Sequence, residues 1–216
     1  MILCDIGNTT FHFKTKKRDF KIGVKESFKN ISLDKSQIYF ISVNKTATKR
    51  LLKRYPNSID IKNIIKFKTS YIGIGIDRKV VCSYLNNAII VDSGSAITVD
   101  VVKKGKHKGG FILPGLKSYK KIYPQISKKL SFQFSNNINL GKMPLTTNDA
   151  INYAIVDSIV STILKVYKKY KLPIYFTGGN GEKLLKYFID CDTKYEKNLI
   201  FKSMKSIIKK KKKRGK

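Results

Sequence analysis

The segment Asp5-Ile-Gly-Asn-Thr9 lies between an apolar stretch and an alternating one, and the pattern returns as Asp92-Ser-Gly-Ser-Ala96. In the first copy the apolar run Met1–Ile6 leads into the turn, and Thr10-Phe-His-Phe-Lys14, in which polar and apolar residues alternate, follows it. This alternation is typical of a half-buried strand, so each copy predicts a strand–turn–strand unit. The repeat predicts an α/β protein made of two similar halves that face a cleft.

The rest of the chain supplies further strands and helices. A helix is expected over Thr147–Lys169, because apolar residues recur in it every four positions and Thr146 can cap its start. Gly105–Gly110 is interpreted as a turn. The predicted organisation is an N-terminal half, a C-terminal half and a self-repelling basic tail that stays disordered. Their bounds are 1–87, 88–208 and 209–216.

The formal charge of +31 raises the question of nucleic-acid binding. However, 40 of the 45 basic residues are lysine, whereas base-reading surfaces favour arginine. We therefore attribute the charge mainly to composition and expect no specific nucleic-acid partner. No run approaches about 18 consecutive apolar residues, so no membrane association is expected. The start lacks a secretory signal and the three cysteines are scattered, which favours a cytoplasmic location.

The two turns have the composition of phosphate-binding loops. Glycine lets backbone N–H groups approach a ligand closely, and short hydroxyl or amide side chains add donors. Asp5 repels a phosphate unless a divalent cation, typically Mg²⁺, bridges the two. Both turns also fit simple hairpin geometry, in which Asp and Gly serve the backbone alone.

Gly75-Ile-Asp77-Arg78 places an acid beside a guanidinium after a glycine-containing loop. This pair suits a substrate that carries both a hydroxyl and a carboxylate. The same tetrapeptide is equally compatible with an ordinary helix start. The sequence contains no P-loop motif, and Gly73-Ile-Gly75 is only a partial dinucleotide fingerprint.

Four segments together resemble the type III pantothenate kinases, members of the superfamily of actin, hexokinase and the Hsp70 ATPase. They are Asp5–Thr9, Gly75–Arg78, Val91–Asp100 and Gly109–Gly115, with Thr147 and Thr177-Gly-Gly179 in the expected order. The resemblance covers residues 1 to about 190 and implies two ribonuclease H-like halves, each a mixed sheet with flanking helices, with the active site between them.

The resemblance also implies the roles of individual residues. Asp77 would be the catalytic proton acceptor. Residues that would bind ATP are Asp5, Ile6, Gly7, Asn8, Thr9, Thr10, Phe11, His12, Ser95, Gly178 and Gly179. Residues that would bind pantothenate are Tyr71, Gly75, Ile76, Asp77, Arg78 and Thr147. Asp5 would act on Mg²⁺ through ATP, and Asp92 would hold a monovalent cation, K⁺ or NH₄⁺. A homodimer is implied.

Three features depart from the family pattern. Ser95 replaces the usual threonine but keeps a hydroxyl, the helix after Arg78 is less alanine-rich, and the chain is short. The implied function is ATP-dependent phosphorylation of pantothenate, the first step of coenzyme A biosynthesis. Two alternatives stay open: a transcriptional accessory or nucleic-acid-binding protein of the same fold, and a kinase of another small alcohol.

Overall fold

The computed structural model describes most of the chain. The described residues are 1–28, 31, 33, 36–135 and 137–214, without the side chain of Arg214. The chain divides into two compact units. Met1–Leu85 together with Asn198–Lys216 forms the first unit, and Asn86–Lys197 forms the second.

The first unit is built on a five-stranded mixed sheet of order β3-β2-β1-β4-β5. Its elements are β1 (Ile2–Ile6), β2 (Thr10–Lys14), β3 (Asp19–Gly23), β4 (Ile38–Ser42), α1 (Lys45–Arg54), β5 (Ile59–Asp60), the 3₁₀ helix η1 (Ile61–Asn63), α2 (Ile76–Cys82) and α6 (Leu199–Arg214). β1, β2 and β3 pair antiparallel, whereas β1, β4 and β5 pair parallel. The predicted strand–turn–strand unit is therefore the β1–β2 hairpin.

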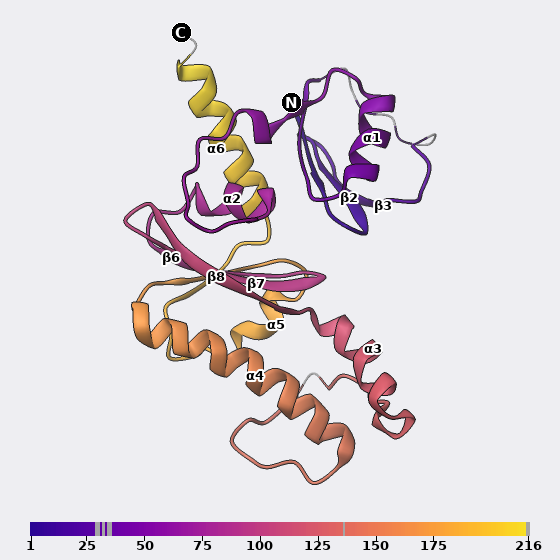
Figure 1. The fold of residues 1–216 in the computed structure, drawn as a ribbon, viewed down its shortest axis with the longest axis vertical. Coiled ribbons are helices and arrows are strands. Elements are labelled where there is room, and N and C mark those ends of the chain that lie inside the picture. Colours follow the sequence, from indigo (N-terminus) through magenta and orange to yellow (C-terminus); the bar gives the residue numbers. More distant parts are fainter. Residues whose placement is uncertain (29–30, 32, 34–35, 136, 215–216) are drawn as a thin grey trace. The chain divides into compact units, whose positions relative to one another are not determined.

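Side-chain alternation along β1 places a different core on each face of this sheet. Cys4 and its neighbours at positions 2 and 6 pack with Leu51 of α1. Leu3 belongs to a second cluster, which contains Val80 of α2 and Phe201 of α6. Figure 1 shows α1 along the first sheet and α2 beside α6. The sheet is thus covered by helices on both faces.

The second unit repeats this plan with the order β10-β9-β6-β7-β8. Its elements are β6 (Ala88–Ser93), β7 (Ala96–Lys103), β8 (Lys106–Pro114), α3 (Leu116–Ile126), the 3₁₀ helix η2 (Lys128–Leu130), α4 (Thr147–Tyr170), β9 (Ile174–Thr177), α5 (Gly181–Leu185) and β10 (Thr193–Tyr195). β6, β7 and β8 pair antiparallel, whereas β6, β9 and β10 pair parallel. The pairing directions match those of the first unit strand for strand, which confirms two similar mixed-sheet halves.

The long helix α4 supplies the main core of the second unit. Ile151, Ile155, Ile159 and Ile163 are buried in a cluster with residues of the sheet, as their spacing predicts. Figure 1 shows α4 along this sheet. The helix starts where predicted, because the Thr146 side chain accepts a hydrogen bond from the backbone N–H of the residue three positions on. By length and composition alone α4 is apolar enough to cross a membrane. Its buried stripe is that of a core helix.

The C-terminal segment differs from the prediction. The sequence predicts residues 199–208 in the second half and 209–216 as a disordered tail. The structure instead contains one helix, α6, which belongs to the first unit and continues to Arg214, and residues 215–216 lie outside the described residues. Its first turns are anchored by buried apolar residues, Met204 and Ile208 among them. Lysine is a good helix former, and positive charge at a helix C-terminus interacts favourably with the helix dipole, so the lysine run extends the helix.

Two smaller differences lie in the second unit. The predicted turn at Gly105–Gly110 is confined to Lys104 and Gly105, which both have positive φ, and β8 begins at Lys106. The helix α3 was not predicted, because it has no buried residue and contains Pro124. The available signal was the helical spacing of Leu116, Tyr119 and Tyr123, which pack partly buried against the core of the second unit.

Candidate functional site

The first predicted phosphate turn joins β1 to β2. Gly7 N–H donates to the Thr10 carbonyl at 3.0 Å, and the Thr9 carbonyl accepts from Val24 N–H at 2.9 Å. Asn8 and Thr9 are exposed. A methyl group on Gly7 would lie 3.7 Å from the Thr10 oxygen, an ordinary contact. The turn is therefore held at both ends, and in its middle the Asn8 carbonyl accepts a 3.4 Å hydrogen bond from Asn44 Nδ2.

Asp5 and His12 are direct cross-strand partners beside this turn. His12 Nε2 lies 2.6 Å from an Asp19 carboxylate oxygen, and its ring packs edge-on against Phe201 with centroids 4.7 Å apart. Partial burial lowers the pKa of His12, and nearby Lys21 acts in the same direction, whereas the bond to Asp19 opposes them. The histidine of the predicted ATP strand is thus tied to β3 and α6.

The predicted substrate loop, residues 71–78, ends at the start of α2. Arg78 is buried, and its guanidinium carbon lies 4.7 Å from the centroid of the Tyr71 ring. Arg78 N–H donates to Asp77 Oδ1 at 2.8 Å. A methyl group on Gly75 would collide with that same carboxylate oxygen. The structure therefore brings Tyr71, Gly75, Asp77 and Arg78 together, and the glycine leaves room for the Asp77 carboxylate.

The second turn joins β6 to β7, and two glycines of its own unit lie close against its backbone, although Gly94 and Ser95 are exposed. The position of a methyl group on Gly115 is blocked by the Ser95 carbonyl group and by the Gly94 oxygen at 2.8 Å. On Gly178, which has φ +81°, a methyl group would meet Asp92 Oδ1 and lie 2.7 Å from the Ser93 carbonyl. The predicted cation residue Asp92 and the predicted adenosine residue Gly178 are therefore neighbours.

Two predicted residues of the second unit lie at the margins of elements. Gly179 follows Gly178 and has no heavy atom within 4 Å of its potential methyl position. Thr147 is the first residue of α4 and is exposed. Asp92, Ser95, Thr147 and Gly178 belong to one unit, whereas Asp5 and Asp77 belong to the other.

Sequence reasoning missed the structural parts of this second turn. Gly115 ends the segment Gly109–Gly115, and only its closeness to Ser95 in the structure shows why a side chain is excluded there. Asn180 N–H donates to the Ser93 carbonyl at 3.1 Å, which ties the loop after β9 to the end of β6. A glycine at the end of a strand was the available signal, but the sequence does not indicate which distant residue that glycine contacts.

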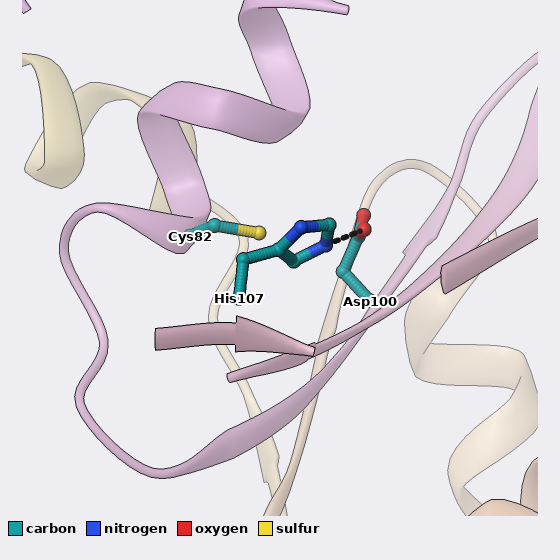
Figure 2. Close-up of side chains that lie close together, drawn as sticks. All are labelled: Cys82, Asp100 and His107. Atoms are coloured by element: carbon teal, nitrogen blue, oxygen red, sulfur yellow. Dashed lines mark hydrogen bonds and ion pairs between the residues drawn. The ribbon is translucent and has the colours of Figure 1, made fainter. Parts of the chain in front are cut away.

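A buried polar pair in the same sheet was also missed. His107 of β8 is hydrogen-bonded to Asp100 of β7, with Nε2 and Oδ1 2.8 Å apart. Their side chains are 0% and 3% exposed. Figure 2 shows the imidazole ring aimed at the carboxylate, with the bond drawn as a dashed line. The pair satisfies two polar groups inside the sheet and has no assigned part in the predicted chemistry.

Comparison with known structures defines the class of protein first. MreB 5 of Spiroplasma citri bound to AMPPNP aligns over 100% of this chain and 98% of its own, with TM-score 0.52 and 10% identity. A Campylobacter jejuni protein that carries the name of a Baf family transcriptional activator aligns far better. Its TM-score is 0.83 at 36% identity, with 99% of this chain and 100% of that chain covered. The fold is that of the actin-like ATPases.

Sequence comparison then identifies the family. The family model for type III pantothenate kinase matches residues 9–169. A type III pantothenate kinase of Helicobacter hepaticus is 38% identical over 214 residues, which cover 97% of this chain and 99% of that protein. The chain belongs to the type III pantothenate kinase family. It is a kinase that uses ATP to phosphorylate pantothenate in coenzyme A biosynthesis, and the two alternative functions are not favoured.

Proposed function

We propose that Asp77 is the proton acceptor in the transfer of the γ-phosphoryl group from Mg·ATP to the primary hydroxyl of pantothenate. The observation that carries this proposal is the Asp77–Arg78–Tyr71 arrangement. The Asp77 carboxylate is held at the first turn of α2 by Arg78 N–H and by the space beside Gly75. A carboxylate fixed in this way can accept the hydroxyl proton as the oxygen attacks phosphorus.

Arg78 is proposed to bind the carboxylate of pantothenate. Its guanidinium is buried against the Tyr71 ring, which leaves a planar set of donors in a fixed orientation. A charge-assisted bond in such a partly dry setting is stronger than one in water. The acid and the guanidinium are adjacent in sequence, so one short segment would hold both ends of the acceptor. Thr147 is proposed to add a hydrogen bond from the second unit.

The two turns are proposed to bind the nucleotide. The turn Gly7–Thr9 would offer the exposed polar groups of Asn8 and Thr9 to the phosphates, with Asp5 acting on Mg²⁺ through ATP. In the second unit, Ser95 would contact ATP, and Gly178 and Gly179 would lie beside the adenosine. Phosphoryl transfer passes through a loose transition state, so positioning and neutralisation of charge dominate the catalysis. Magnesium bound with ATP would supply part of that neutralisation.

Asp92 is proposed to hold a monovalent cation. Its Oδ1 and the Ser93 carbonyl oxygen both lie close to Gly178, too close for a side chain there, and a carboxylate with a carbonyl oxygen suits K⁺ or NH₄⁺. Asp92→Ala is expected to abolish stimulation of the kinase by K⁺. An unchanged K⁺ dependence of turnover contradicts this assignment.

The test of the catalytic proposal is ADP release that depends on pantothenate, with Mg²⁺ and K⁺ present. Asp77→Asn is expected to lower kcat by at least about a hundredfold, because a general base contributes roughly 10²–10⁴-fold. Asp190→Asn, which alters an exposed acid elsewhere, is the matched control and should keep wild-type turnover. Turnover of Asp77→Asn within threefold of wild type would remove Asp77 from this role.

A cytoplasmic homodimer completes the proposal. The family resemblance implies the dimer, and exposed apolar side chains before α4 support it, since Met143 is 73% and Leu145 90% exposed. Light scattering coupled to size-exclusion chromatography measures the mass directly. Leu145→Glu should shift the mass from dimer to monomer, and a monomeric wild-type chain at micromolar concentration contradicts the dimer.

A further inference from the structure

The outer side of α6 carries a lysine-lined depression on the first unit. It has a volume of about 420 Å³. Its lining residues are Tyr84, Lys202, Lys205, Ser206, Lys209, Lys210 and Lys213. Among the described residues that line this lysine groove, none is acidic. It therefore gathers five positive side chains around one hollow.

The lysines are held in place by the packing of the opposite side of the helix. Phe201, Met204 and Ile208 are buried in the core cluster of the first unit. Lys205 and Lys209 consequently project to the exposed side. Positions three and four apart on a helix repeat along one face at about 5–6 Å, so the amines form a row. The row lies on a helix whose first turns are anchored in the core of the first unit.

We propose that the lysine groove binds the phosphate backbone of single-stranded nucleic acid without reading its sequence. A row of ammonium groups complements a chain of phosphates, and lysine neutralises phosphate as a point charge without selecting a base. Tyr84, 41% exposed at the rim, supplies a ring on which an unpaired base can stack. A duplex keeps its bases stacked inside, so the tyrosine favours a single strand.

An anionic membrane is the main competing occupant. A membrane-bound amphipathic helix inserts its apolar face between the lipids. In α6 this face is occupied by the core, since Phe201, Met204, Ile207 and Ile208 are all buried. The groove therefore offers lipid only its charge, whereas a single strand can use both the charge and the tyrosine ring. These features favour nucleic acid.

The experiment titrates the full chain against a fluorescein-labelled 20-nucleotide oligo(dT) and follows fluorescence anisotropy. For single strands, the slope of log affinity against log salt concentration is about −0.7 for each neutralised phosphate. If about five phosphates are neutralised, the affinity should therefore fall roughly a hundredfold between 50 and 200 mM salt. A mixed-sequence 20-mer of equal length should bind within about threefold of oligo(dT). No measurable binding at 50 mM salt overturns the proposal.

Matched variants separate the groove from the net charge. The triple variant K205E/K209E/K213E should weaken binding at least tenfold. The control K165E/K168E/K169E makes the same charge change on exposed positions of α4, next to Tyr170, and should weaken it less than threefold. If both triple variants lose the same amount of affinity, the binding depends on net charge and the proposed role of the lysine groove is wrong. Pantothenate kinase activity and melting temperature confirm folding, and K205Q/K209Q/K213Q replaces the first variant if it fails to fold.

Two further arms identify the occupant. Tyr84→Leu should weaken oligo(dT) binding about tenfold while Tyr84→Phe keeps it, because a stacking ring is retained in phenylalanine. If Tyr84→Leu binds as well as wild type, Tyr84 is not a stacking platform, and the argument for a single strand is wrong. Sedimentation with phosphatidylserine-containing vesicles tests the membrane. Vesicle binding without oligonucleotide binding overturns the proposal.

Discussion

The two strand–turn–strand copies share a sequence pattern and a topology, but their turns are supported in different ways. The turn after β1 has open space beside Gly7, where an added methyl group would make only an ordinary contact. The turn after β6 is closed in by Gly115 and Gly178, which approach its backbone too closely for any side chain. The same motif thus forms a loop with room beside its glycine in one unit and a braced loop in the other, and only the braced loop depends on glycines far away in sequence.

The hairpins that follow show the same contrast. Each carries a histidine bonded to a carboxylate seven residues away. The His12–Asp19 pair is 18% and 38% exposed, whereas the His107–Asp100 pair is 0% and 3% exposed. A hydrogen bond between exposed groups replaces bonds to water and adds little, whereas a buried polar group that loses its partner costs much more. The second unit should therefore be the less tolerant of change.

The largest effect expected from this contrast is that of Gly178→Ala. Alanine at φ +81° is strained, and its methyl group would collide with the Ser93 carbonyl and the Asp92 carboxylate. We expect a loss of roughly 3 kcal/mol in the free energy of unfolding, or a melting temperature lower by about 6–12 °C for a chain of this size. Thermal unfolding followed by circular dichroism measures this.

The controls for this prediction lie beside it and in the other turn. Gly179→Ala and Gly7→Ala should each change the melting temperature by less than about 3 °C, since neither methyl group would meet a close atom. If Gly7→Ala destabilises the chain as much as Gly178→Ala, the distinction between an open and a braced turn is wrong.

The outcome of the sequence predictions follows the same division. Features that follow from local sequence patterns could be predicted: the two hairpins, the apolar stripe of α4 and its Thr146 cap. The partners of Gly115 and Gly178 were not, because a contact between a glycine and a distant backbone leaves no periodic signal. The helical tail was missed for a related reason. Charge repulsion within residues 209–213 is visible in the sequence, whereas the buried Met204 and Ile208 that anchor the helix act through tertiary packing.

The histidine pairs provide the next comparison. His107→Leu removes the partner of a buried carboxylate oxygen and is expected to cost roughly 1–3 kcal/mol of stability. His12→Leu removes the corresponding bond of a partly exposed pair and should cost less than about 1 kcal/mol. Urea unfolding of both variants and wild type gives the two differences. Equal losses, or a larger loss for His12→Leu, break the proposed contrast between the units.

The smallest expected effect is the pH dependence of the first pair. The pKa of His12 is lowered in the folded chain, mainly by burial, so the folded state disfavours the protonated ring. The unfolded chain then binds the extra proton more readily, and stability falls as the pH drops through the usual histidine pKa of 6.5 and below it. The pKa of Asp19 is also lowered, because hydrogen bonds from Lys14 and His12 outweigh the effect of its partial burial.

Stability also falls with decreasing pH because of Asp19. Its contribution to stability is lost in a more acidic range, as the pH drops below the usual aspartate pKa of 3.8. Melting temperatures of wild type and His12→Gln between pH 7.5 and 5 test the histidine, because glutamine keeps a polar side chain but does not titrate. We expect the melting temperature of wild type to decrease more than that of His12→Gln over this pH interval. Parallel curves would show that the histidine of the open hairpin does not set this dependence, and a wild-type chain that gains stability on acidification would reverse the sign assigned to its pKa.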